Sequence, residues 1–148
     1  MIGIYGGTFD PVHYGHLRTA LEVSEALGLA ELRLVPCQIP PHRETPGATP
    51  AQRVRMLRAA LAGADPGVRV DARELARPGP SYMVDTLASL REELGAAPLG
   101  LIVGMDAFLG LPRWHRWETL LTLAHVIVMQ RPGHAPAWPP ELARIVSD

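Results

Sequence analysis

Two histidines, three residues apart, follow a glycine pair near the start of the chain. His13 and His16 end the string Gly-Gly-Thr-Phe-Asp-Pro-Val-His-Tyr-Gly-His, which begins at Gly6 and Gly7. Imidazoles donate hydrogen bonds to oxyanions and change charge near neutral pH, and the two glycines allow a tight backbone turn close to a ligand. A helix beginning here adds unpaired N–H groups and the positive end of its dipole. The pattern predicts a phosphate-binding site.

The other residues of this string have less specific roles. Thr8 can donate its hydroxyl to a phosphate oxygen or bond to its own backbone. Phe9 is expected to pack, Asp10 is expected to form or cap the turn, and Gly15 keeps the surface between the histidines open. A zinc site would need a third ligand that the string does not supply. No metal ligands are therefore predicted.

The string is similar to the signature of the His-x-Gly-His nucleotidyltransferases, and over its full length it resembles bacterial nicotinate-nucleotide adenylyltransferases. The resemblance implies a Rossmann-like fold and transfer of adenylate from ATP to nicotinate mononucleotide, giving deamido-NAD and pyrophosphate in NAD biosynthesis. It also implies Mg²⁺ bound with ATP. Within the string, it implies that His16 and His13 stabilise the transferring phosphate. The ATP contacts that it implies in this string are Gly6, Gly7, Thr8, Phe9, His13, Gly15 and His16.

A second basic element follows the next apolar run. Pro40-Pro41-His42-Arg43 resembles the family's Pro-Pro-His-Lys, with arginine in place of lysine. Arginine keeps the positive charge and adds a planar fork of donors. The resemblance implies that Arg43 faces the triphosphate as a third catalytic donor and that His42 contacts the mononucleotide. A surface loop with incidental charges is the alternative.

Residues 78–86 resemble the family's Pro-Ser-Tyr-Thr-x-Asp-Thr segment, with methionine at position 83 in place of threonine. The mononucleotide contacts that this resemblance implies are Ser81, Tyr82, Met83, Asp85 and Thr86. A contact through the backbone N–H of Met83 would survive the substitution, whereas a hydroxyl contact would not. Ser81 is also a candidate helix cap. Asp85 and Thr86 have an alternative role in helix packing and dipole compensation.

The segment Gly104-Met105-Asp106 resembles the family's Gly-x-Asp, which implies ATP contacts at Gly104 and Asp106. A carboxylate at a strand end can accept both hydroxyls of the adenosine ribose. By pattern alone, Asp106 is equally well suited to be a helix N-cap.

Residues 111–117 read Leu-Pro-Arg-Trp-His-Arg-Trp and resemble the family's Leu-Pro-x-Trp. Trp114 is the candidate for stacking on a pyridine ring, an interaction that contributes about 0.5–1.5 kcal/mol beyond burial. His115 is assigned to the same mononucleotide site, and Trp117 is expected to lie in the core.

The elements that must position these motifs follow from hydrophobic periodicity. Strands are predicted at residues 2–5, 32–36, 68–71, 99–103 and 126–129. Helices are predicted at residues 14–27, 51–62, 81–94 and 141–146, with short pieces around 107 and 117. Leu17 and Leu27 are placed on one face of the first helix, with Gly28 as its stop. The alternation predicts an α/β fold, an open parallel five-stranded sheet with helices on both faces, which binds ligands at the carboxyl ends of its strands.

Composition limits the class of protein. The 148 residues predict a single domain, residues 1–148. A net charge of −1 argues against a nucleic-acid-binding protein. All 14 basic residues are arginine, which excludes a Walker A lysine, a pyridoxal phosphate Schiff base and a kinase lysine. Cys37 is the only cysteine, so neither an internal disulfide nor a cysteine-based zinc site can form.

No secretory signal or apolar run of about 18 residues is visible. We therefore expect a cytoplasmic protein without a membrane or nucleic-acid partner. The sequence is compatible with a homo-oligomer and does not decide the oligomeric state. The resemblance covers about residues 1–134, and the family's late Ser-Ser/Thr-x-x-Arg element has no counterpart. We expect a truncated chain in preference to a naturally short form.

Two other functions are compatible with the same motifs. One is another nucleotidyltransferase of the superfamily, a phosphopantetheine adenylyltransferase or a cytidylyltransferase. The other is a non-catalytic nucleotide-binding module. A dehydrogenase is disfavoured because Gly3, Gly6 and Gly7 do not form Gly-x-Gly-x-x-Gly.

Overall fold

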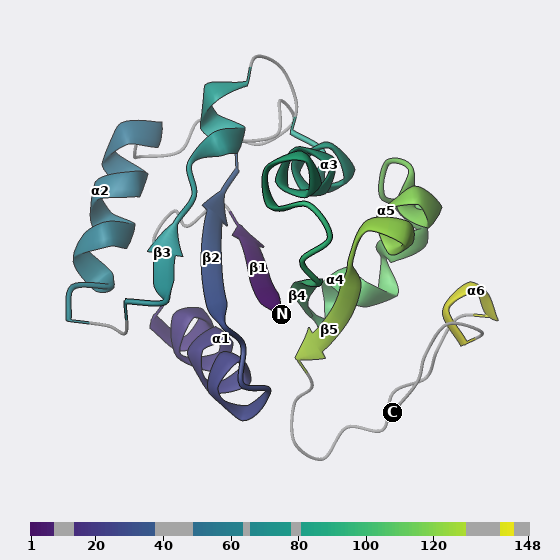
Figure 1. The fold of residues 1–148 in the computed structure, drawn as a ribbon, viewed down its shortest axis with the longest axis horizontal. Coiled ribbons are helices and arrows are strands. Elements are labelled where there is room, and N and C mark those ends of the chain that lie inside the picture. Colours follow the sequence, from purple (N-terminus) through teal and green to yellow (C-terminus); the bar gives the residue numbers. More distant parts are fainter. Residues whose placement is uncertain (8–13, 38–48, 64–65, 78–80, 130–139, 144–148) are drawn as a thin grey trace.

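A five-stranded parallel sheet forms the centre of the chain, as predicted. The computed structural model describes residues 1–7, 14–37, 49–63, 66–77, 81–129 and 140–143. The strands are β1 (Ile2–Gly7), β2 (Glu31–Pro36), β3 (Val68–Val70), β4 (Leu99–Gly104) and β5 (His125–Met129). Their order is β3-β2-β1-β4-β5, with every neighbouring pair parallel (Figure 1). The order reverses between β1 and β4, where such sheets bind ligands.

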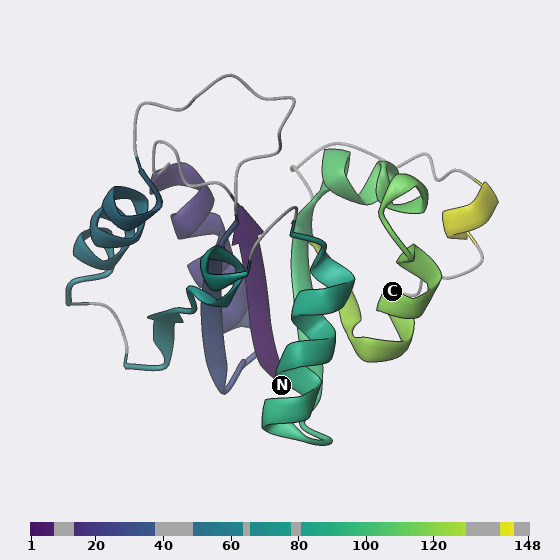
Figure 2. The same cartoon turned by 90° about the horizontal axis from the view of Figure 1, so that it is seen from above.

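Helices cover both faces of the sheet, which confirms the predicted layers. The α-helices are α1 (Tyr14–Ala26), α2 (Pro50–Ala60), α3 (Met83–Leu94), α4 (Met105–Leu109), α5 (Trp117–Leu123) and α6 (Pro140–Ala143). Two short 3₁₀ helices are η1 (Arg73–Ala76) and η2 (Leu111–Arg113). The helices α1 and α3 lie on opposite faces of the sheet (Figure 2).

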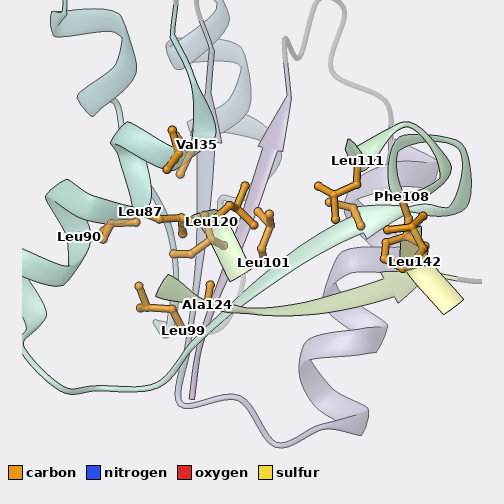
Figure 3. Packing of buried hydrophobic residues seen from close by; sticks show 13 residues of the cluster. Val35, Leu87, Leu90, Leu99, Leu101, Phe108, Leu111, Leu120, Ala124 and Leu142 are labelled. Carbon is orange, nitrogen blue, oxygen red and sulfur yellow. The ribbon is translucent and has the colours of Figure 1, made fainter. Parts of the chain in front are cut away.

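Each face of the sheet has its own hydrophobic core because successive strand residues point to opposite sides. Ile4 packs with α3 and α5, whereas the adjacent Tyr5 packs with α1 and α2. Figure 3 shows the first of these cores, where Leu87 and Leu120 approach Leu101. The apolar stretch of β4 is buried on both faces, as its continuous hydrophobic sequence predicted.

The predicted ends of the five strands are correct to within two residues. The difference at the end of β1 concerns the site. Gly6 and Gly7 were expected to form a turn, but both belong to β1 and pair with Val35 and Pro36 of β2. The parallel ladder with β2 continues beyond the apolar run because glycine accepts extended backbone.

Two predicted helix ends also differ from the structure. Leu27 is 55% exposed instead of buried, because α1 ends at Ala26 and Gly28 adopts a positive φ of 61°. Leu29 then packs against the core beside α1. Ser81 is not the N-cap of α3: Tyr82 holds that position. The expected helix at residues 141–146 corresponds to α6, whose end at Ala143 meets the limit of the described residues.

An ion network ties the sheet to η1 and α3. It consists of Arg33 on β2, Asp71 after β3, Arg73 on η1 and Glu93 on α3. Arg33 Nη1 donates to Asp71 Oδ2 at 2.9 Å and to Glu93 Oε2 at 3.0 Å. Arg73 Nε donates to Asp71 Oδ1 at 2.9 Å, and its Nη2 donates to Glu93 Oε2 at 2.8 Å. Burial alone would raise the pKa of Asp71, but these arginines outweigh it and hold the pKa below its ordinary value.

Among the described residues, no helix is both long enough and apolar enough to cross a membrane.

Candidate functional site

A cavity of about 440 Å³ opens at the point where the strand order reverses. Its floor comes from the carboxyl-terminal parts of β1 and β4, and its walls come from η1, the start of α3 and the end of η2. The lining residues are Gly6, Gly7, Cys37, Glu74, Ser81, Tyr82, Met83, Val84, Leu101, Ile102, Val103, Arg113, Trp114 and His115. The cavity therefore joins three of the motifs that the sequence singled out.

Gly6 is the point where β1 meets α3. A Cβ atom built on Gly6 would lie 2.9 Å from Met83 Cε, which is closer than real Cβ contacts come. Met83 Cε is the end of a flexible side chain, so a small shift of that methyl group would relieve the contact. Gly6, Gly7 and the start of α3 line the same cavity.

Aromatic groups form the wall opposite β1. Trp114 is partly buried and lines the cavity, where it also packs against the core beside α3. The rings of Tyr82 and His115 stack on each other, with centroids 4.2 Å apart and planes 28° from parallel. Trp117 packs against the same core, as expected. The predicted stacking residue thus lies where a flat ligand in the cavity can reach it.

Glu74 is a lining residue that the sequence reasoning missed. Its side chain is buried, and Oε2 accepts a hydrogen bond from Thr86 Oγ1 at 2.5 Å. Arg77 Nη2 lies 3.9 Å from the same oxygen and donates to Thr86 Oγ1 at 2.5 Å. Burial raises the pKa of the Glu74 carboxyl, and the bonds from Thr86 and the charge of Arg77 offset part of that rise. The Asp-x-Arg-Glu run at residues 71–74 was the available signal, since charged residues directly after a strand are placed at the ligand-binding edge.

The 78–86 motif divides into residues that line the cavity and residues that support it. Ser81, Tyr82 and Met83 line it, as the resemblance implied. Thr86 is fully buried, does not line the cavity and uses its hydroxyl on Glu74 and Arg77. Asp85 is exposed in the first turn of α3, where its charge complements the helix dipole.

The Gly-x-Asp motif stands at the carboxyl end of β4, beside β1. Gly104 is the N-cap of α4, and its Cβ position has no atom within 4 Å. The alternative role of Asp106 as N-cap is therefore wrong, because Asp106 is an exposed residue in the first turn of α4. Neither residue lines this cavity, and their contact with ATP stays a prediction.

Several predicted site residues lie outside the described part of the chain. These are Thr8, Phe9, Asp10, His13, Pro40, Pro41, His42 and Arg43. Gly15 and His16 belong to the first turn of α1, but their side chains are not described. The chain reaches these residues from the carboxyl ends of β1 and β2.

The described cavity is suited to a flat ring with an anionic substituent. Leu101 and Val103 contribute apolar surface, and Trp114 contributes an aromatic face. At the start of α3 the N–H groups of Asp85 and Thr86 donate to the Tyr82 carbonyl, so those of Met83 and Val84 are left for a ligand at the positive end of the dipole. Arg113 adds a cation to the lining, and Glu74 adds a carboxyl group. Among the described residues, no three His, Cys, Asp or Glu side chains form a group that could hold a metal ion.

Comparison with known protein families gives one match over nearly the whole chain. Residues 4–146 match the family described as cytidylyltransferase-like. A protein of Methylococcus capsulatus named probable nicotinate-nucleotide adenylyltransferase is 62% identical over 148 residues, which is 100% of this chain and 70% of the relative. A protein of Halorhodospira halophila with the same name is 58% identical over 146 residues, 99% of this chain and 66% of the relative. The chain thus spans about two thirds of the length of these relatives.

Solved structures share the fold. A structure from Vibrio parahaemolyticus, provisionally named nicotinate-nucleotide adenylyltransferase, matches with a TM-score of 0.72 at 18% identity, covering 91% of this chain and 80% of the other. A Plasmodium falciparum nicotinic acid mononucleotide adenylyltransferase in complex with NaAD matches with a TM-score of 0.68 at 15% identity. That match covers 90% of this chain and 76% of the other. Both comparisons support the Rossmann-like architecture.

Proposed function

The chain belongs to the cytidylyltransferase-like family and, within it, to the nicotinate-nucleotide adenylyltransferases, and from that premise we propose that it joins nicotinate mononucleotide to the adenylyl group of ATP. The products are deamido-NAD and pyrophosphate, in the biosynthesis of NAD. The observation that carries this proposal is the cavity at the β1–β4 reversal, which combines the start of α3 with Trp114.

The reaction needs no covalent intermediate on the protein. A phosphate oxygen of the mononucleotide attacks the α-phosphorus of ATP in line and forms a new P–O bond. The bond from the α-phosphorus to the bridging oxygen of the β-phosphate breaks, and pyrophosphate leaves with that electron pair. Because the nucleophile is already an anion, no general base is required. Catalysis comes from positioning, which can contribute about 7–11 kcal/mol, and from preorganised donors at the phosphate oxygens.

We assign the pyridine ring of the mononucleotide to the described cavity. Its aromatic face stacks on Trp114, and its carboxylate points toward the first N–H groups of α3 and toward the charge of Arg113. The backbone N–H of Met83 serves this purpose as well as that of a threonine, which accounts for the methionine at this position. His42 and His115 are the remaining mononucleotide contacts that we propose.

The transferring phosphate is assigned to the end of β1, where α1 begins. His16, His13 and Arg43 are the proposed donors to the phosphate oxygens, and Asp106 is the proposed partner of the adenosine ribose. Support for this assignment comes from the strand register, since Tyr5 of β1 lies beside Ile102 of β4 and both strands end at one edge. ATP and the mononucleotide can then meet above that edge.

Nucleotidyltransferases of this kind generally use a divalent cation, and we propose that it is Mg²⁺ bound to the triphosphate of ATP. Mg²⁺ keeps several of its own waters when it binds with substrate phosphates. The cation would neutralise charge on the triphosphate.

A pyrophosphate-release assay with a panel of acceptors tests the proposal. The 148-residue chain is incubated with ATP and Mg²⁺ and with nicotinate mononucleotide, nicotinamide mononucleotide or 4′-phosphopantetheine, and separately with CTP and glycerol 3-phosphate. We expect release with the pyridine mononucleotides, with the acid preferred over the amide. Release only with phosphopantetheine or CTP would transfer the assignment to another branch of the superfamily. Calorimetric binding of ATP without release from any acceptor would favour a nucleotide-binding module instead.

A further inference from the structure

We propose that Glu74 and Thr86 are positioning residues for the mononucleotide, holding the first turn of α3 in place as a wall of the cavity. The inference rests on the proposed function, because it concerns the same cavity. It assigns a role to a buried carboxylate that the reaction itself does not use, and it changes the role of Thr86 from a ligand contact to a support.

Glu74 bonds to residues on both sides of Tyr82–Val84, the wall segment that lines the cavity. Its Oε2 accepts from Thr86 Oγ1 at 2.5 Å, and its backbone carbonyl accepts from Ser81 Oγ at 3.4 Å. The residues between these two anchors, Tyr82 to Val84, line the cavity. One buried residue of η1 therefore sets where that stretch of backbone lies.

The Thr86 hydroxyl is engaged by protein groups. It donates to Glu74 and accepts from Arg77 Nη2, and the side chain has no exposed surface. A ligand in the cavity cannot reach this hydroxyl directly. Any effect of Thr86 on the substrate must therefore pass through the position of α3.

The start of α3 lacks the usual side-chain cap. The N-cap Tyr82 makes no side-chain hydrogen bond to the first turn. By contrast, α2 begins with a complete capping box, in which Thr49 and Gln52 bond to each other's backbone. Because side-chain caps fix a helix start, the first turn of α3 depends on other contacts for its position, and the Thr86–Glu74 bond is one of them. The N–H groups of Asp85 and Thr86 donate to the Tyr82 carbonyl, so those of Met83 and Val84 are the ones that helix geometry leaves for a ligand.

A second bond between the same two elements provides the matched control. Arg73 Nη1 of η1 donates to Ser89 Oγ of α3 at 2.9 Å, one turn beyond Thr86. Ser89 does not line the cavity. Losing this bond removes a link of similar kind between η1 and α3 without changing the wall segment.

The test compares Thr86→Val with Ser89→Ala in the full chain, using steady-state pyrophosphate release and thermal unfolding. Thr86→Val should raise KM for nicotinate mononucleotide by roughly two- to tenfold, the size of one net hydrogen bond, while KM for ATP stays unchanged. Ser89→Ala should lower Tm and leave both KM values unchanged. Thr86→Ser, which keeps the hydroxyl, should restore the wild-type KM.

A second variant covers the case in which Thr86→Val does not fold. Glu74→Gln keeps an acceptor for Thr86 but loses the charge beside Arg77, and it should raise the same KM by a smaller factor. Equal KM values in Thr86→Val, Ser89→Ala and the wild type would overturn the inference while leaving the proposed function intact. A wild-type chain that releases no pyrophosphate with nicotinate mononucleotide would overturn both.

Discussion

The Glu74–Thr86 pair and the ion network both connect η1 to α3, yet they have different surroundings. Glu74 lines the cavity and anchors the first turn of the helix. The ion network joins Arg33 and Asp71 to the far turns of α3, away from the cavity lining. We propose that similar polar contacts serve substrate binding at Glu74 and stability alone in the ion network. We therefore expect that changes at the cavity edge alter kinetics, whereas changes in the network alter unfolding.

The largest effect is expected at the proposed phosphate site, from His16→Ala. Removing one preorganised donor to a developing oxyanion typically lowers kcat by about 10²–10³-fold. KM for ATP should change little, and the free energy of unfolding should stay within about 0.5 kcal/mol of wild type. Single-turnover and steady-state kinetics measure the rate and KM, and urea unfolding measures the free energy of unfolding. A variant with wild-type kcat would remove His16 from the catalytic assignment.

The largest stability effect is expected in the ion network, from Asp71→Asn. Asp71 accepts from Arg33 and from both the backbone and side chain of Arg73. The amide keeps one acceptor oxygen but replaces the other with an NH₂ donor that faces an arginine, which should cost about 1–3 kcal/mol of unfolding free energy. Both KM values should remain at wild-type levels. Glu22→Gln is the control, because its pair with Arg18 is exposed and such pairs contribute at most about 1 kcal/mol.

The two regions should also respond oppositely to acid. The pKa values of Asp71 and Glu93 lie below their ordinary values, so their stabilising contribution is present above the ordinary carboxyl range and is lost as pH falls through the lowered pKa values. The pKa of Glu74 is raised, so its contribution is present at low pH and is lost as pH rises through the raised pKa.

Urea unfolding between about pH 7 and pH 3, a range that contains the ordinary carboxyl pKa values, measures this difference. Asp71→Asn should flatten the loss of stability on the acid side, and Glu74→Gln should steepen it. Identical pH profiles for the two variants would contradict the contrast between the two regions.

A smaller effect is expected from Trp114→Ala. Stacking contributes about 0.5–1.5 kcal/mol beyond burial, so KM for nicotinate mononucleotide should rise by roughly two- to tenfold, with KM for ATP unchanged. Trp114→Phe keeps an aromatic face, so its KM for nicotinate mononucleotide should lie between the values of the wild type and Trp114→Ala. Equal increases in both KM values would show that Trp114 acts on the fold instead of on the ring.

The sheet and several cavity residues could be predicted from the sequence. At these places the hydrophobic patterns of strands and helices stand directly beside recognisable motifs. The apolar run of β4 and the helical periodicity of α3 are visible in the local sequence alone. The predicted bounds of both elements are therefore nearly correct. Trp114 and Met83 were found through motifs that stand next to such elements. The prediction failed where tertiary pairing decides, as at Gly6, which pairs with Val35 of β2 instead of turning.

The charged run at residues 71–74 could indicate the ligand-binding edge, but it could not show that Glu74 is buried or which groups it bonds, for a related reason. Its partners Ser81 and Thr86 are seven and twelve residues away in sequence. The carboxylate is buried where η1 and α3 are joined by the Glu74–Thr86 and Arg73–Ser89 bonds. A charged residue in a short 3₁₀ helix shows no pattern in the local sequence that indicates burial. The motif alone likewise gives no sign that the Thr86 hydroxyl bonds to Glu74 and Arg77.

In our proposal, the cavity beside Gly6 and Trp114 holds the pyridine end of the mononucleotide while adenylate is transferred. The decisive experiment is a crystal structure of the chain with nicotinate mononucleotide. We expect a ring stacked on Trp114, with its carboxylate at the first N–H groups of α3. A ring bound elsewhere, with the cavity filled only by solvent, would contradict it.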